Sequence, residues 1–495
     1  MSEGQGWLFE PTFNRALKVR PTDERLTADA GFVLLREADH RLGLTASLAA
    51  GLSDPRDPER VRYRIAELLR ERLYALSAGY RHQDDLDRLA HDPALKAAVW
   101  DRPGDRVADE RLGSQPTTSR LLNILTASAA NLQALRGALA DWIGAHQRAA
   151  GPDRRVRQGT LDIDSFPIPV HGDQPGGAYN GYYGRTVYHP LVASFAPEGD
   201  YDATRLGDGF VHAILRDGAA PSAQGAVRFI DHALAAARPL AAHIDLRMDA
   251  AFMIGKVMDP LTDQGVRFVG RLKSLAPLEE RARPYLRRPP GRPPAEGYER
   301  VVDLGSYQAG PWRHPQRILL VVVDRPDPQT GQLNLLPDSF FLATHWTPPQ
   351  RTPYALLEHY RRRGTFEDRF GEFNAAVGVR LSSPTFLQNE ATLLLSLLAF
   401  NLASILRSEM EMASPHGWDL GRLQQSVLKA AGRLARGARR LRLHLAQATA
   451  PLWRRLIDRL SRWRSTRQRP GAPGPRPRPW VAPPPHAHLT PVLRC

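Results

Sequence analysis

Apolar residues recur at helical spacing through the first third of the chain. In the run VRYRIAELLRERLYAL (61–76) they fall three or four positions apart, which places them on one stripe of a helix. A second run, rich in Leu and Ala, predicts a helix over 121–143 with Thr118 or Ser119 as its cap. We therefore predict a mainly helical region over 1–154. Such helices can form a binding module or a supporting layer, and periodicity fits both.

Short β-like runs replace this pattern from about residue 155. An Ala-rich helical run over 220–238 lies between the second and the third of them. Strands followed by a helix and then by further strands predict an α/β sheet with at least one parallel crossover. The four runs are TLDIDSF (160–166), YHPLVASFA (188–196), HIDLRMDAAF (243–252) and VRFVGRL (266–272).

A Pro- and Arg-rich stretch, RARPYLRRPPGRPPAEG, then offers little for regular structure. It introduces a separate block of β-like runs, VVDLGSYQ, RILLVVVD and SFFLATHW, before helical spacing returns at 352–363. We predict a β-rich insertion over 273–349 that divides the α/β core into 155–272 and 350–410.

The longest apolar run, LLLSLLAFNLASIL (393–406), is too short for the roughly 20 residues that cross a bilayer, and Asn401 interrupts it. It predicts a buried core helix and no membrane partner. The N-terminal MSEGQGWLFEPTF has no secretion-signal pattern. Cys495 is the only cysteine, which excludes a disulfide framework and a Cys-based zinc site. These features predict a cytoplasmic protein.

Positive charge is concentrated at the C-terminal end. Residues 411–495 hold 17 Arg or Lys against 3 acidic residues, or +14 of the net +15. Such a segment gains affinity for polyphosphate by releasing counterions, so we predict nucleic acid as a partner and a place at the nucleoid. An Arg-rich, GC-biased genome is the alternative explanation. We predict a basic helical region over 411–466 and a Pro-rich disordered tail over 467–495.

A set of arginines is predicted to lie on one helix of this basic region, where they could follow DNA phosphates. A solvated helix face is the competing interpretation, although few acidic residues lie nearby. The set is Arg433, Arg436, Arg439, Arg440 and Arg442.

Three acidic residues stand where an α/β sheet would present them at an edge. Asp164 closes the first β-like run, Asp249 closes the third, and Glu367 lies in a helix after the insertion. Alternation puts Asp162 on the same face as Asp164, and Asp245 on the same face as Asp249. We choose the terminal residue of each pair, because ligands bind beyond the carboxyl ends of strands in open α/β sheets.

Three carboxylates that converge repel one another unless a cation offsets their charge. Mg²⁺ prefers oxygen ligands, and two such ions about 3.5 to 4 Å apart can assist phosphodiester displacement. A lone Asp in a β-like run is more often a turn or capping residue. The acidic residues alone therefore indicate this chemistry only weakly.

Several longer segments carry a resemblance to a known family. The chain resembles the D-D-E insertion-sequence transposases, in particular the group numbered family thirteen-eighty, over roughly residues 20 to 465. The segments are PTDERLTADAGFVLLRE, RLYALSAGYRHQDDLDRLAHDP, SQPTTSRLLN, TLDIDSFPIPVHGDQPGGAYNGYYGRTVYHPL, LRMDAAF and YRRRGTFEDRF.

The last segment resembles a transposase signature in which Tyr, Arg, Glu and Lys stand at fixed spacing. Tyr360, Arg363 and Glu367 match it, while the final Lys falls at Asn374. The resemblance implies that Glu367 is the third metal ligand and that Tyr360 and Arg363 hold DNA. An Arg suits that role because its planar fork binds phosphate at two points. Arg369 is a candidate to replace the missing Lys.

The resemblance also implies a ribonuclease H-like core interrupted by a β domain. It implies cut-and-paste transposition with two Mg²⁺ ions, or Mn²⁺ as a substitute, at Asp164, Asp249 and Glu367. The partners would be transposon terminal inverted repeats, bound by the helical region over 1–154, and target DNA, in a homodimeric synaptic complex. Two alternatives remain: an inactive DNA-binding derivative, suggested by Asn374, and a ribonuclease H-like, structure-selective nuclease.

Weaker candidates lie in the loop HGDQPGGAYNGYYGRTVYHP. Its aromatic side chains could stack on exposed bases, or the loop could be a hairpin connection with surface tyrosines. His212 and His243 are predicted to be ordinary core or surface residues. The loop candidates are His171, Gln174, Tyr179, Tyr182 and Tyr183.

Overall fold

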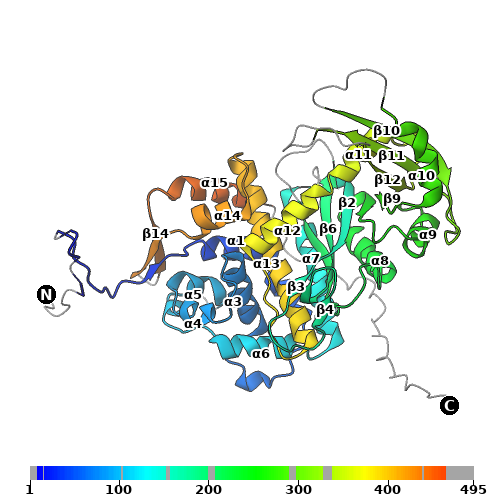
Figure 1. The fold of residues 1–495 in the computed structure, drawn as a ribbon. Helices are drawn as coiled ribbons and strands as arrows, with labels where there is room; N and C mark the ends of the chain where they lie inside the picture. Colours follow the sequence, from blue (N-terminus) through cyan, green and yellow to red (C-terminus); the bar gives the residue numbers. More distant parts are fainter. Residues whose placement is uncertain are drawn as a thin grey trace, which may run out of the picture.

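The computed structural model describes most of the chain. It combines a helical N-terminal part, a large mixed sheet with helices on both faces, and a smaller C-terminal part (Figure 1). The predicted tail over 467–495 and Arg439 lie outside the described residues. The residues that the structure describes are 8–9, 11–14, 16–101, 104–151, 156–198, 207–288, 297–326, 337–437 and 440–463.

The N-terminal part is helical, as predicted. The expected helix over 121–143 is two helices, because the chain turns at Ser128, whose hydroxyl caps the second by accepting from the Asn131 N–H. The predicted caps Thr118 and Ser119 instead lie inside the first of the two. The helices are α1 (Phe32–Leu42), α2 (Leu44–Ala50), α3 (Ile65–Ser77), α4 (Asp85–Leu89), α5 (Pro93–Val99), α6 (Gln115–Leu125) and α7 (Ala129–Ala150), with short 3-10 turns at Pro58–Arg60 and Arg106–Ala108.

An eight-stranded sheet forms the centre of the molecule, in the order β10-β11-β12-β9-β8-β2-β6-β7. The pairs β2–β8 and β8–β9 are parallel, and α8 (Ala226–Ala237) and α9 (Gly255–Asp263) make the connections. The predicted parallel crossover is confirmed. The strands are β2 (Val156–Ser165), β6 (Leu191–Glu198), β7 (Gly209–Ile214), β8 (Ala241–Met248), β9 (Arg267–Leu272), β10 (Tyr298–Tyr307), β11 (Gln316–Asp324) and β12 (Asp338–Thr344).

The β-rich block over 273–349 does not form a sheet of its own. Its strands β10, β11 and β12 continue the central sheet, because β12 pairs antiparallel with β9. This pairing covers backbone groups of β9 that an edge strand would leave exposed. The Pro-rich stretch before β10 also contains regular structure, since α10 (Ala276–Ala282) and a 3-10 turn at Arg283–Tyr285 extend into it.

One face of the central sheet is apolar, and the other is polar where β2 and β8 lie. Leu161 and Ile163 of β2 and Leu246 and Met248 of β8 pack in the apolar core that includes α8. The intervening positions of both strands are mostly polar or charged, as the period of two requires. Over this side of the sheet lie α11 (Pro353–Arg361) and α12 (Gly364–Ala376). They contact it through buried polar side chains at β6 and β8. Leu356 of α11 also packs in an apolar cluster with β9, β11 and β12, and Phe373 of α12 packs against Phe210 of β7.

A long helix, α13 (Phe386–Ala413), joins the N-terminal helices to the sheet. It is long and apolar enough to cross a membrane by composition, but 94% of its apolar window is buried inside the protein. Asn401 donates 2.8 Å to the Phe210 carbonyl and accepts 3.0 Å from the Phe210 N–H of the edge strand β7. The prediction of a buried core helix is confirmed.

The C-terminal part is not the predicted all-helical region. Between α14 (Leu420–Leu423) with its π-helical extension (Gln424–Leu428) and α15 (Ala450–Ser461), the chain forms strands β13 (Gly432–Gly437) and β14 (Arg440–Leu445). These two strands and β1 (Leu26–Thr27) make a three-stranded sheet. The run RLRLHL alternates with a period of two, which favours a strand over the predicted helix.

A third, small sheet follows β2 and carries part of the Gly- and Tyr-rich loop. It contains β3 (Ile168–Pro169), β4 (Ala178–Asn180) and β5 (Arg185–Tyr188), in the order β3-β5-β4. The hairpin interpretation of this loop is therefore confirmed.

Candidate active site

Two of the three predicted carboxylates leave the sheet side by side. In the parallel pair β2–β8, Ile163 lies opposite Met248, and Asp164 and Asp249 each follow by one residue. Neighbouring strands lie about 4.8 Å apart, so the two residues emerge close together at the carboxyl end of the sheet. Both belong to its polar face. The sequence argument that these positions meet is therefore confirmed by the strand register.

Glu367 reaches the same place from α12, where it lies in the first turn with 68% of its side chain exposed. Arg363, at the start of that helix, donates to Glu367 at 3.0 Å and also to the Asp164 carboxylate. One guanidinium thus joins two of the predicted ligands. The arrangement brings the helix after the β-rich block to the strand end across 199 residues of sequence.

The charge of this cluster changes the acidity of Asp164. Burial raises the pKa of Asp164 to about 6, Arg363 and the Ser165 N–H oppose the rise, and Asp249 and Glu367 add to it. A carboxyl group that loses its proton reluctantly near two other carboxylates is typical of a site that gathers negative charge for a cation.

Two tyrosines lie beside these carboxylates. Burial raises the pKa of Tyr360, and Asp249 and Glu367 are among the charges that act on it. Burial also raises the pKa of Tyr183, and the charge of Asp164 is the second cause of this rise. Tyr360 comes from α11 and Tyr183 from the Gly- and Tyr-rich loop. That loop therefore contributes one of its three candidate tyrosines to the site.

The cluster offers oxygen ligands to a divalent metal ion. All three candidate ligands are carboxylates, which is the chemistry that Mg²⁺ selects. Among the residues that the structure describes, however, no group of three acidic, His or Cys side chains is arranged to hold one ion. Arg363 occupies the space between Asp164 and Glu367 and supplies the positive charge. The three carboxylates have the chemistry of Mg²⁺ ligands. For them to converge on one ion, Arg363 must first release Asp164 and Glu367.

The family model described as transposase DDE domain, group 1, matches residues 9–465. The chain belongs to this family. No curated protein matches it. Among solved structures, the cryo-EM structure of a piggyBac transposase synaptic complex with hairpin DNA is similar, with 11% identity, a TM-score of 0.41, and coverage of 89% of this chain and 87% of that one.

The transposase holds Asp162 in a buried ion pair, which decides between the two acidic residues of β2. Arg247 donates to both Asp162 oxygens, at 2.8 and 2.7 Å, and both residues are at most 2% exposed. The third guanidinium nitrogen donates 3.0 Å to the His359 carbonyl in α11. Asp162 is thus held by Arg247, whereas Asp164 lies in the cluster with Arg363 and Glu367.

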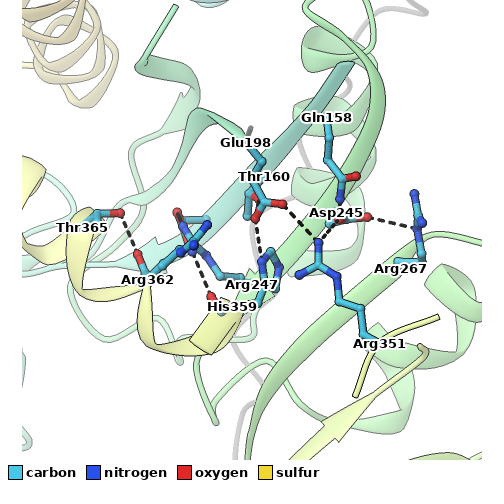
Figure 2. Close-up of polar contacts among 11 residues, drawn as sticks. Gln158, Thr160, Glu198, Asp245, Arg247, Arg267, Arg351, His359, Arg362 and Thr365 are labelled. Atoms are coloured by element: carbon cyan, nitrogen blue, oxygen red, sulfur yellow. Dashed lines mark hydrogen bonds and ion pairs between the residues drawn. The ribbon is translucent and has the colours of Figure 1, made fainter. Parts of the chain in front are cut away.

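Asp245 is engaged in a similar way, as Figure 2 shows. Arg351 points at both Asp245 and Glu198, at 3.8 and 3.2 Å, and Arg267 lies 3.1 Å from the other Asp245 oxygen. Burial alone would raise the pKa of Glu198, but His359, Thr160 and Arg351 outweigh it and hold the pKa at about 2. This cluster ties α11 to the sheet.

Sequence reasoning missed most of these supporting residues. Arg247 could have been found, because alternation from Asp245 to Asp249 places it on the same face of β8. Arg216 could not have been found from the sequence, since no spacing distinguishes it from the other arginines. Its guanidinium donates to three backbone carbonyls of the 217–224 loop and to the His189 carbonyl, and burial lowers its pKa to about 10.

Arg369 is not a DNA-facing replacement for the signature lysine. It is 4% exposed, and it lies 2.5 Å from Asp208 and donates 2.6 Å to the Ser194 hydroxyl. The helical period explains this, because α12 turns position 369 toward the sheet. Asn374, where the signature has lysine, is exposed on α12.

The predicted basic arginines lie on the β13–β14 hairpin and divide into two kinds. Arg433 pairs with Glu24 at 2.7 Å, and Arg436 pairs with Asp105 and Asp109. Arg440 and Arg442 are exposed on one face of β14. Part of this charge therefore fastens the hairpin to the N-terminal region, and the rest faces solvent.

The two predicted ordinary histidines agree with the structure. His212 is buried in β7, where burial, helped by Arg136 and His232, lowers its pKa to about 3. His243 is exposed on β8.

Proposed function

We propose that this transposase cleaves DNA at the ends of an insertion sequence and joins the freed ends to target DNA. Asp164, Asp249 and Glu367 are the proposed metal ligands. The observation that carries the proposal is the parallel register of β2 and β8, which places two carboxylates side by side while α12 brings the third. The ribonuclease H-like description and membership of family thirteen-eighty belong to the same proposal.

Two Mg²⁺ ions, or Mn²⁺ in their place, would activate the attacking oxygen and stabilise the departing one. The chain's own contribution is positioning. The Arg363 guanidinium can exchange its carboxylate partners for a phosphate, to which it can donate two parallel hydrogen bonds. The half-buried Tyr360 hydroxyl lies beside the same carboxylates and is proposed to orient the scissile strand.

The proposed substrate is duplex DNA that carries terminal inverted repeats. The exposed Arg440 and Arg442 on the β14 hairpin would contact backbone phosphates without reading bases. Two protomers would hold two ends in one synaptic complex, as the resemblance implies. The N-terminal helices would bind the repeats.

A plasmid that carries the ends of the element tests the proposal. With Mg²⁺ present, the purified protein should nick the plasmid at the repeats, and Asp249→Ala should lose this activity by at least about a thousandfold. Asp231→Ala, at an exposed position of α8, is the matched control and should cut normally. Nicking by Asp249→Ala at the wild-type rate would disprove the assignment.

A second function has its own support. Arg363 bridges two of the three carboxylates, and Asn374 replaces the signature lysine. Both features fit a derivative that binds DNA without cutting it. Binding of the repeats by the wild-type protein with no cleavage in Mg²⁺ or Mn²⁺ would favour this function. Equal cleavage of repeat-bearing and random duplexes would instead favour a structure-selective nuclease.

A further inference from the structure

A polar pocket of about 740 Å³ lies where the N-terminal helices meet the segments around the small sheet and the start of α13. Its walls come from α3, residues 81–84 before α4, α6, the end of β3 with the loop after it, residues 379–383, and α13. We refer to it as the interdomain pocket. Among the residues that line it are Arg72, Arg81, Thr118, Gln174, Arg380 and Ser383.

Three buried polar atoms in this lining have no hydrogen-bond partner within the described part of the chain: Arg72 Nη1, Thr118 Oγ1 and Gln174 Oε1. Arg72 is 6% exposed and Thr118 is 2% exposed. Buried polar groups nearly always have partners, and each one left unsatisfied costs about 1 to 3 kcal/mol. Three residues of this one lining each carry such an atom, which favours a polar ligand here.

The charge of the pocket favours an anion. Arg72 donates 3.2 Å to the Arg81 carbonyl through Nη2, and no carboxylate within the described ranges forms an ion pair with it. Burial lowers the pKa of Arg72 to about 10, so the group still carries its charge at neutral pH. Arg81 and Arg380 add two more guanidinium groups, whereas Asp84 is the single acid in the lining.

Sequence segments singled out by the family resemblance converge on this pocket. RLYALSAGYRHQDDLDRLAHDP supplies Arg72 and Arg81, SQPTTSRLLN supplies Thr118, and the Gly- and Tyr-rich loop supplies Gln174. Pro169, also in the lining, follows Asp164 by five residues. An extended chain of that length spans at most about 18 Å. The pocket therefore lies within a few nucleotides of the candidate active site.

We propose that the interdomain pocket binds one nucleotide. Its phosphate would be held by the guanidinium groups led by Arg72, and the polar edge of its base would meet Thr118 and Gln174. The volume suits this ligand, because pockets for small molecules measure about 300 to 1,000 Å³. The nucleotide would come either from solution or from the end of a DNA strand. This inference goes beyond the proposed cleavage reaction and needs none of its three carboxylates.

Calorimetric titration of the full chain without divalent ions tests the proposal. The probes are deoxyadenosine 5′-monophosphate, a 5′-phosphorylated tetranucleotide and inorganic phosphate. Thr118→Val is the decisive variant, with Thr117→Val, one residue earlier on α6 and outside the lining, as its control. Loss of one hydrogen bond should weaken binding of the mononucleotide or tetranucleotide about fivefold in Thr118→Val only.

Thermal unfolding provides the second readout. Because the Thr118 hydroxyl has no partner, replacing it with a methyl group should leave the melting temperature unchanged or raise it. Weaker binding with undiminished stability supports a ligand contact. Tighter binding of the tetranucleotide than of the mononucleotide would assign the site to a strand end, and the reverse would assign it to a free nucleotide.

Three results would overturn the proposal: no binding of either nucleotide probe, equal binding by the Thr118→Val and Thr117→Val proteins, or phosphate binding as tight as nucleotide binding. Asp249→Ala should bind the nucleotide like the wild type. A failed cleavage assay and a failed binding assay are therefore distinguishable.

Discussion

Arg247 binds Asp162 through two parallel hydrogen bonds, 2.8 and 2.7 Å long, in the buried polar face of the central sheet. The same guanidinium donates to the His359 carbonyl near the end of α11. Four residues later the chain reaches Arg363, which contacts Asp164. The pair thus links the strand that ends at Asp164 to the helix segment that carries Arg363 and Glu367.

Breaking this pair should be costly. Asp162→Asn leaves the Arg247 cation buried without its counter-charge, so we expect the free energy of unfolding to fall by about 3 to 5 kcal/mol. Urea denaturation measures this loss. The double variant Asp162→Leu with Arg247→Met should lose less, because it removes both charges together. A loss under about 1 kcal/mol in Asp162→Asn would show that the pair is not desolvated as the structure describes.

Glu71 gives the protein a pH-dependent stability. Its side chain is 1% exposed and accepts 3.2 Å from the Gly113 N–H, and burial raises its pKa from 4.5 to about 8. The folded state therefore holds a proton that the unfolded state releases above pH 4.5. This contribution is complete below pH 4.5 and is lost as pH rises through about 8.

Glu71→Gln should remove the dependence, because the amide keeps the acceptor and cannot ionise. At pH 8 we expect the free energy of unfolding of the variant to exceed that of the wild type by on the order of a few kcal/mol. At pH 4.5 the two free energies should be equal. Denaturation at several pH values measures the difference. A constant offset between the two proteins would contradict a buried, protonated Glu71.

Local patterns were sufficient to predict the strands of the core and the meeting of Asp164 and Asp249. A period of two along β2 and β8 identifies which residues share a face, and the parallel connection brings their carboxyl ends together. Local patterns could not show that β12 pairs with β9. That pairing joins segments far apart in sequence and depends on the unpaired edge that β9 would otherwise present.

The errors at Arg369 and in the basic hairpin have different causes. Arg369 is predicted as a substitute for the signature lysine missing at Asn374, although its burial against Asp208 depends on how α12 sits on the sheet. The run from Arg440 to Leu445 alternates plainly, yet the prediction for this segment is a basic helix whose arginines could follow DNA phosphates. Charge alone does not distinguish a basic helix from a basic strand, whereas the period does.

Arg369 and Arg440 should respond to substitution in opposite ways. Arg369→Met removes the nearer of two cations at the buried Asp208, the other being Arg407 at 4.0 Å, so we expect a stability loss of about 3 kcal/mol and little change in the DNA affinity of the protein that remains folded. Arg440→Ala should leave stability unchanged, weaken DNA binding, and lower the slope of log affinity against log salt by about 1. Chemical denaturation and fluorescence anisotropy at several salt concentrations measure both. Arg440→Ala with an unaltered salt slope would place the DNA elsewhere.

In the proposed function Arg363 would compete with metal ions for the carboxylates, because its guanidinium already contacts Asp164 and Glu367. Arg363→Met should therefore bind Mn²⁺ more tightly in the absence of DNA, on the order of tenfold, since the ion no longer displaces a partly buried cation. The same variant should cut DNA poorly, because it lacks the fork that would hold the phosphate. Electron paramagnetic resonance of free Mn²⁺ gives the affinity, and the plasmid assay gives the cleavage rate. Glu367→Gln removes a proposed ligand and keeps the arginine, so it should lose both Mn²⁺ affinity and DNA cleavage. Equal Mn²⁺ affinity in Arg363→Met and the wild type would mean that the ion and the guanidinium do not share these oxygens.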